Sequence, residues 1–173
     1  MTAISLDLSK KTELRWLSGL VRRVAAAAGD LPFFITGATA RDLILQYGYE
    51  IDAARKTQDV DFAFMVETWP AFEALRLRLL ATGEFAAAPG NNHRLVCNTG
   101  MLVDLVPFGD IERPDRTIAW PPSGLVVMNV FGFKEALAAT ISVLLPERIT
   151  TQVVSLPALA LLKMSAWMER RHV

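Results

Sequence analysis

The chain has 173 residues, of which 18 are basic, 18 are acidic and 52% are hydrophobic. This length corresponds to about one domain, and the apolar content, above the usual ~45–50%, excludes a disordered protein. A net charge of zero excludes a nucleic-acid binder that relies on a strongly basic overall charge. We therefore expect one folded domain over residues 1–173.

The cysteine content and the N-terminus indicate the compartment. The one cysteine, Cys97, excludes an intramolecular disulfide, which favours a reducing environment. Charged residues at Asp7, Lys10 and Lys11 interrupt the N-terminus before the apolar core of a signal peptide could form. No run approaches the ~18 apolar residues of a membrane-spanning helix. We expect a cytoplasmic protein without a membrane partner.

Hydrophobic periodicity predicts helices alternating with strands in the first half of the chain. Apolar residues recur at helical spacing in the N-terminal segment 1–30, where Gly29 and Asp30 end the pattern. Short apolar runs bounded by turn residues indicate strands. The predicted elements are a helix over residues 9–28, a strand over 33–35, a helix over 40–47, a strand over 60–65 and a helix over 69–81.

The second half predicts a β-meander and then further strands and helices. Turn residues separate three short apolar runs, as in a meander, and a Pro-Glu-Arg turn predicts that the last two strands pair. The predicted elements are strands over residues 85–88, 94–98, 101–107, 125–130, 140–145 and 150–154, and helices over 133–138 and 156–170, within a C-terminal segment 156–173. The fold class is α/β (α+β), a mixed twisted sheet flanked by helices.

Two carboxylates alternate along the strand over residues 60–65. Residues i and i+2 of a strand share a face about 7 Å apart, so Asp59 and Asp61 lie side by side. Like charges this close repel unless a cation lies between them, and Mg²⁺ prefers carboxylate oxygens. The pair therefore predicts a magnesium site. Alone, an Asp-x-Asp pair is more often a solvated strand edge.

A third carboxylate, Asp104, interrupts the apolar strand over residues 101–107. An acid in an apolar strand is costly unless it is paired or binds a metal. A hairpin with the strand over 60–65 would bring Asp104 beside Asp61, and three acids would hold two ions roughly 3.5–4 Å apart, as in phosphoryl-type transfer. A structural salt bridge between Asp104 and Arg94 is the alternative.

A small-residue turn over residues 36–40 joins a predicted strand to a predicted helix. Backbone N–H groups and a helix N-terminus then meet at one point, which suits a phosphate. Gly37 allows close backbone approach and Thr39 offers a hydroxyl. Alone, such a turn is as often only a connection.

Three segments together resemble the DNA polymerase β-like nucleotidyltransferase superfamily, and in particular the AbiEii-type toxin nucleotidyltransferases. They are residues 34–43, 55–61 and 103–106. The Gly-Ala-x-x-Arg-Asp run over residues 37–42 also resembles, more loosely, the head domain of CCA-adding tRNA nucleotidyltransferases. The resemblance implies transfer of NMP from an NTP to an acceptor hydroxyl. It further implies a tRNA 3′ end as a candidate acceptor and an antitoxin as a candidate partner.

The resemblance also implies roles for individual residues. The catalytic and metal-binding residues, which would hold two Mg²⁺ ions, are Asp59, Asp61 and Asp104, the last of which activates the attacking hydroxyl. The nucleotide-binding residues are Gly37, Ala38, Thr39, Arg41, Arg55, Thr57, Lys163 and Arg170. Ala38 stands where the family more often has Gly or Ser, a mild change because alanine is also small.

The last helix carries the final part of the resemblance. Lys163 and Arg170 match a Lys-x-x-Ala-x-x-x-Arg pattern and, seven residues apart, share one helix face that suits a polyanion. Alone, Lys163 is more simply a lysine on a core helix with its head in solvent. The family helix continues into Lys-Asp-x-x-Asp, which is absent here. A truncated helix is therefore one alternative, in which the apolar segment 156–167 is a face for residues or a partner that this chain lacks.

Other candidates favour structural interpretations. We expect His93 to be a polar surface residue, and Trp69, Trp120 and Trp167 to be core anchors. Two further functions remain open beside the metal-dependent nucleotidyltransferase. One is a catalytically idle module of the same fold that binds a nucleotide or a partner, and the other is a nucleotidyltransferase that modifies a small molecule.

Overall fold

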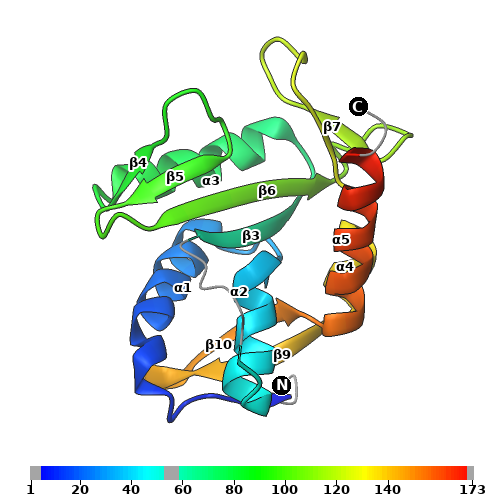
Figure 1. The fold of residues 1–173 in the computed structure, drawn as a ribbon. Coiled ribbons are helices and arrows are strands. Elements are labelled where there is room, and N and C mark those ends of the chain that lie inside the picture. The colour runs from blue at the N-terminus through cyan, green and yellow to red at the C-terminus, as the bar shows by residue number, and fades with distance from the viewer. Residues whose placement is uncertain (1–4, 53–58, 171–173) are drawn as a thin grey trace.

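The computed structural model describes residues 5–52 and 59–170 (Figure 1). The strands are β1 (Leu6–Asp7), β2 (Phe33–Thr36), β3 (Asp59–Val66), β4 (Phe85–Ala87), β5 (Arg94–Cys97), β6 (Leu102–Gly109), β7 (Thr117–Ala119), β8 (Val127–Asn129), β9 (Thr140–Leu145) and β10 (Ile149–Val154). The α-helices are α1 (Arg15–Ala28), α2 (Gly37–Asp42), α3 (Trp69–Ala81), α4 (Phe133–Ala138) and α5 (Leu156–Arg170). Short turns of other helix types are η1 (Thr12–Leu14), η2 (Leu43–Gly48) and η3 (Pro146–Arg148).

An eight-stranded mixed sheet forms the centre of the molecule, with strand order β1-β9-β10-β2-β3-β6-β5-β4, while β7 and β8 form a separate pair. The predicted mixed α/β fold is therefore confirmed. The meander β4-β5-β6 and the antiparallel pairing of β9 with β10 also agree with the prediction. The helices α3, α4 and α5 have the predicted bounds.

The N-terminal third differs from the prediction in detail. The first helix begins at Arg15, because β1 and η1 occupy the residues before it. The second helix begins earlier than predicted, at Gly37, and continues into the π-helical η2. Strands β1 and β7 were not predicted, since two or three residues carry too little periodicity to be recognised.

The predicted hairpin between the strands of Asp61 and Asp104 is wrong, because β3 and β6 pair in parallel. After β3 the chain passes through α3, runs along β4 in the direction of β3, returns along β5, and enters β6 in the direction of β3 again. Nevertheless, the register places Asp61 directly opposite Asp104. Asp61 and Asp104 are therefore neighbours, as predicted, but in a parallel and not an antiparallel pair.

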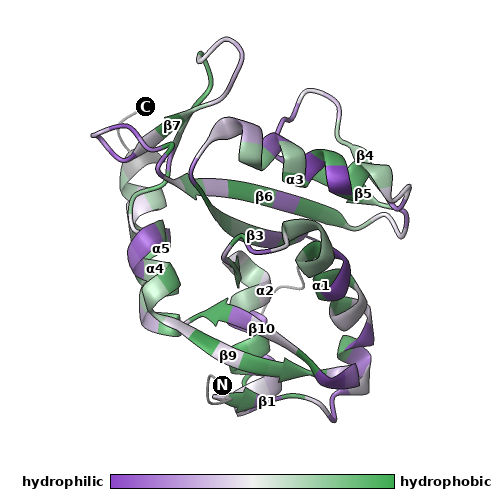
Figure 2. Cartoon of the chain, turned by 180° about the vertical axis from the view of Figure 1, so that it is seen from behind, coloured by the Kyte–Doolittle hydropathy of each residue, from purple (hydrophilic) through white to green (hydrophobic). Residues whose placement is uncertain are grey.

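The two faces of the sheet have different partners. Phe33 and Phe34 point to opposite faces, because side chains alternate along a strand. The Phe33 ring lies 5.5 Å from that of Phe64, whereas the Phe34 ring lies 5.9 Å from Phe108 and 6.4 Å from Phe133 of α4. Helices α1 and α3 contact each other, and Figure 2 shows them in front of the sheet when it is seen from behind. Helix α5 contacts both α2 and α4, so these three cover the Phe34 face.

The tryptophans and the last helix only partly follow the prediction. Trp120 is a core residue, 3% exposed, and Trp69 packs beside it, but Trp167 is 54% exposed and so is not a core anchor. Apolar side chains exposed on α5 are Leu161, Met164, Trp167 and Met168. Three of these four line a groove of about 1060 Å³ between α4 and α5. The predicted apolar face of the last helix is therefore uncovered in this structure.

Within the part of the chain that the structure describes, no helix is both long and apolar enough to cross a membrane.

Candidate active site

The acids of the candidate site come from two neighbouring parallel strands. Asp61 of β3 is paired in register with Asp104 of β6, and adjacent strands lie about 4.8 Å apart. Asp59 shares a face with Asp61 by strand alternation. Asp104 is 7% exposed, and the other two are half-buried. Since Ala63 lies opposite Phe34, this is the face covered by α2, α4 and α5.

Asp104 is held by an arginine from the next strand. Arg94 Nε donates to one carboxylate oxygen of Asp104 at 2.7 Å and Arg94 Nη2 donates to the other at 2.6 Å. These two hydrogen bonds raise the pKa of the Arg94 guanidinium. The salt bridge considered from the sequence is therefore present, and it occupies both oxygens of the third acid. A bidentate pair of this kind also fixes the orientation of the carboxylate.

Asp61 is the electrostatically unusual residue of the site. Burial, followed by the negative charges of Asp104 and Asp59, raises the pKa of Asp61 from 3.8 to about 7. The positive charges of Arg94 and Lys163 act in the opposite direction but do not cancel the rise. The site therefore has an excess of negative charge, which a cation would relieve.

Gly37 makes room for the Asp61 carboxylate. Its φ of +68° lies in the left-handed region, and a Cβ added there would overlap the carboxylate, 2.8 Å from Cγ of Asp61. Glycine is therefore required twice at this position, for its backbone conformation and for the absence of a side chain. The sequence had linked Gly37 only to a phosphate, and that contact stays a prediction, as does the one assigned to Ala38.

Thr39 and Arg41 are engaged within the protein. Thr39 is a buried residue of α2. Its hydroxyl donates to the backbone carbonyl of Asp59 at 3.0 Å and so connects α2 to the start of β3. Arg41 Nε donates to Asp42 at 2.7 Å, and it has a further interaction besides. Both side chains thus support the loop around the acids in this structure, and their predicted phosphate contacts are not tested by it.

The remaining predicted residues come from the C-terminal helix and from residues 53–58. Lys163 is exposed on α5 and near enough to Asp61 to oppose the rise of its pKa. Arg55 and Thr57, as well as the side chain of Arg170, lie outside the described part of the structure. Among the predicted cations, Lys163 therefore acts on Asp61 from α5.

Two residues near the acids were not among the candidate site residues predicted from the sequence. Arg94 was considered only as a salt-bridge partner, although its position in the meander brings it next to all three acids. His93 is half-buried, not a polar surface residue, and its ring lies 5.5 Å from that of Trp120. Burial lowers the pKa of His93.

Among residues 5–52 and 59–170, no three or more His, Cys, Asp or Glu side chains converge as a metal site in this conformation. In this conformation both Asp104 oxygens accept hydrogen bonds from Arg94.

The sequence and the structure of this chain are similar to those of known proteins. The chain matches a protein family described as "Nucleotidyl transferase AbiEii toxin, Type IV TA system" over residues 19–173. The solved structure of the antibiotic-resistance factor ANT(2'')-Ia has 16% sequence identity and a TM-score of 0.44, over 84% of this chain and 68% of that chain. The lincosamide antibiotic adenylyltransferase LnuA has 15% identity and a TM-score of 0.48, over 89% and 85%. No curated protein matches the chain.

Replacement of Gly37 by alanine should displace the Asp61 carboxylate. Gly83 is a matched control, because its φ of +72° is similar but an added Cβ there meets nothing within 4 Å. Both variants, Gly37→Ala and Gly83→Ala, bear the strain of the left-handed conformation, roughly 1–2 kcal/mol. Gly37→Ala should lose about 1–3 kcal/mol more in urea unfolding, because it is also overpacked. Equal losses of stability in the two variants would show that residue 37 and the Asp61 carboxylate are not in close contact.

The pKa of Asp61 predicts how stability depends on pH. Because the folded-state pKa lies above the unfolded value of 3.8, the contribution of Asp61 to stability is fully present below pH 4 and is lost as pH rises through 7. The loss is at most about 4 kcal/mol, since each pKa unit corresponds to about 1.4 kcal/mol. Asp61→Asn should flatten this slope and be more stable than the parent at pH 8, in metal-free urea unfolding. The exposed Asp30→Asn is the control, and an unchanged slope in Asp61→Asn would refute the charge excess.

Proposed function

Because the chain belongs to the AbiEii family of nucleotidyltransferase toxins, we propose that it transfers NMP from an NTP to the 3′ hydroxyl of a tRNA in a Mg²⁺-dependent reaction. The observation that carries the proposal is the register of β3 and β6, which puts Asp61 beside Asp104 on one face of the sheet. Asp59 and the turn at Gly37 lie at the same place.

The donor set fits a magnesium ion. The carboxylate oxygens are hard ligands of the kind that Mg²⁺ takes, and the raised pKa of Asp61 reports negative charge that the described cations do not neutralise. Asp59 and Asp61 would hold the ion, joined by the Asp104 oxygen that stays hydrogen-bonded to Arg94, since each carboxylate oxygen has a second lone pair. When bound, Mg²⁺ neutralises charge on the triphosphate and polarises the phosphorus that is attacked.

In the proposed reaction, Asp104 accepts the proton of the acceptor hydroxyl. The hydroxyl oxygen then forms a bond to the α-phosphorus, while the bond from that phosphorus to the bridging oxygen breaks and pyrophosphate leaves. Asp104 needs one oxygen free for this step, so Arg94 must give up one of its two hydrogen bonds. The freed donor stays near the reacting phosphate and can stabilise its charge.

The nucleotide would be held from two sides of the acids. Backbone N–H groups at Gly37 and Ala38 would face phosphate, with Lys163 reaching from α5. We assign supporting contacts to the remaining residues of the family pattern. These are Thr39, Arg41, Arg55, Thr57 and Arg170.

The family description also bears on the cellular role. We propose that the chain acts as the toxin of a type IV toxin–antitoxin pair, with an antitoxin protein as its partner. A tRNA acceptor places the reaction in the cytoplasm.

Label transfer tests the proposal directly. The purified chain is incubated with each of the four α-labelled NTPs, Mg²⁺ and a tRNA pool. We expect label on tRNA with one or more NTPs, no label with EDTA, and a loss of at least about 100-fold in Asp59→Ala, because that variant lacks a metal ligand. Leu77→Ala, an exposed substitution on α3, should transfer label normally.

The other outcomes of this assay would each contradict the proposal. Binding of NTP and Mg²⁺ in calorimetry without any label transfer would indicate a catalytically idle module. Label on a hydroxylated small molecule, with tRNA left unlabelled, would indicate a small-molecule nucleotidyltransferase.

A separate comparison tests the role of Asp104. Asp104→Asn should lower kcat by about 10²–10⁴-fold, the usual contribution of a general base. Arg94→Lys keeps the positive charge but frees a carboxylate oxygen, so its kcat should stay within about tenfold of the parent. If Asp104 serves only the salt bridge, the two variants should instead lose activity in parallel with their stability in urea unfolding.

A further inference from the structure

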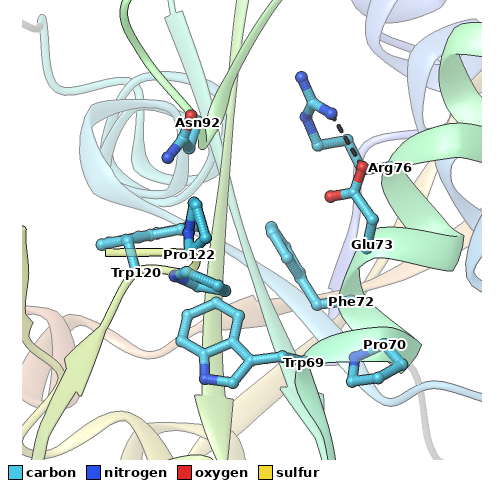
Figure 3. Close-up of a pocket in the computed structure, with 9 residues that line it drawn as sticks. Trp69, Pro70, Phe72, Glu73, Arg76, Asn92, Trp120 and Pro122 are labelled. Atoms are coloured by element: carbon cyan, nitrogen blue, oxygen red, sulfur yellow. Dashed lines mark hydrogen bonds and ion pairs between the residues drawn. The ribbon is translucent and has the colours of Figure 1, made fainter. Parts of the chain in front are cut away.

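A second concave site lies on the opposite face of the sheet from the acids. Arg94 points toward Asp104, so the preceding residue, His93, points to the other face, where its ring meets Trp120. That face is covered by α3. Here a slot of about 550 Å³ opens between α3, the β4–β5 loop and the segment after β7 (Figure 3). This volume falls within the roughly 300–1,000 Å³ of small-molecule sites.

Three aromatic rings form the apolar part of the slot. The ring of Trp69 lies 5.2 Å from that of Trp120, and Phe72 lies 5.6 Å from Trp120 at an angle of 69°. Phe72 and Trp120 are buried, whereas Trp69 is half-buried and therefore accessible. Inclined rings of this kind leave a ring face open for a planar ligand, and every nucleobase has a face that stacks on aromatic side chains.

Polar groups line the rim beside the rings. Figure 3 shows Asn92 on one side of the slot, and Glu73 with Arg76 on the other. Arg76 Nη1 donates to Glu73 at 3.1 Å, so their charges cancel. The pair therefore adds no net negative charge that would favour a cation over a neutral ligand, and it supplies both hydrogen-bond donors and acceptors.

Two buried N–H groups of the lining lack an acceptor. Among the described residues, neither Trp120 Nε1 nor Arg76 Nε has a hydrogen-bond partner, although Trp120 is only 3% exposed. Buried donors without partners are rare in folded proteins. A ligand with carbonyl oxygens or ring nitrogens could satisfy them after a small adjustment of the side chains.

We propose that this slot binds an unpaired nucleobase. A nucleobase is planar, uncharged and carries both donors and acceptors along its edge, which is the combination that the slot presents. It stacks on Trp69, and its edge faces Asn92 and the Glu73–Arg76 pair. The base comes either from a free nucleoside or from a single-stranded stretch of RNA, since both offer the same chemistry. The site is separate from the acids and does not depend on the proposed reaction.

The four tryptophans of the chain provide an internal test. Trp69 and Trp120 line the slot, whereas Trp16 and Trp167 are exposed on α1 and α5. ¹⁵N-labelled protein is titrated, without metal ion or NTP, with each of the four nucleosides and with a single-stranded RNA hexamer. The indole N–H resonances of Trp69 and Trp120 should shift saturably, and the other two should not move. Ribose is the negative control.

Variants localise the binding. Trp69→Leu should weaken it by a factor of about 5 to 100, the usual loss on removal of a stacking ring. The matched Trp16→Leu, at a tryptophan exposed away from the slot, should bind as the parent does. Asn92→Ala, in an exposed loop, serves if Trp69→Leu does not fold, and it should weaken binding at least a few-fold.

Each outcome decides the proposal. Shifts with nucleosides identify a free base as sufficient, and shifts with RNA alone identify a strand as the source. No shift with either probe overturns the proposal, as do equal shifts at all four tryptophans. Shifts of Trp69 and Trp120 with choline but not with nucleosides would also overturn it, in favour of a cation site. Because neither metal nor NTP is present, failure here is distinct from failure of nucleotidyl transfer.

Discussion

The concentration of negative charge on one face of an apolar sheet governs this structure. Strands β3 and β6 are otherwise almost wholly hydrophobic, yet their register brings Asp61 and Asp104 side by side. Two carboxylates at adjacent strand positions repel each other, and burial adds to the cost because the sheet removes water. The structure accommodates the two carboxylates in different ways. Asp104 is paired with Arg94 through both oxygens, whereas Asp61 has no bidentate partner among residues 5–52 and 59–170 and shows a raised pKa.

Residues around the acids hold Asp61 at this position, although its burial is energetically unfavourable. Gly37 has no side chain where the carboxylate lies, and Thr39 ties α2 to the backbone of Asp59. A structure selected only for stability would place an apolar side chain at position 61, since burying a hydrocarbon is favourable whereas burying a carboxylate is costly. Perturbed acids held by specific local geometry are typical of functional sites. The chain belongs to a family of nucleotidyltransferases, and this is the chemistry that we propose for the site.

Much of the fold could be predicted because its longer elements have clear local signals. The bounds of α3 follow from apolar periodicity and from the Thr68 cap, whose hydroxyl accepts from Ala71 N–H at 3.3 Å. The direction of β6 relative to β3 could not be predicted, because this pair joins distant segments and local periodicity does not specify whether two strands pair in parallel. The contact between Gly37 and Asp61 joins residues far apart in sequence, so local patterns indicated a special glycine without its partner. The aromatic slot was missed for the same reason, as Trp69 and Trp120 come from distant segments.

The start of strand β5 contacts both faces of the sheet, and this links the Arg94–Asp104 pair to the slot on the other face. Arg94 contacts the acids, while the adjacent His93 packs on Trp120 at the slot on the other face. His93 directly precedes β5 and is likewise bonded to β6, since His93 O accepts from Leu105 N–H at 2.8 Å. A ligand that shifts Trp120 would therefore act on the start of the strand that positions Arg94. Coupling between the faces requires differential contacts in two arrangements of this strand. The structure shows one of them, in which both Arg94 donors hold Asp104, and the proposed reaction requires the other, in which one donor does.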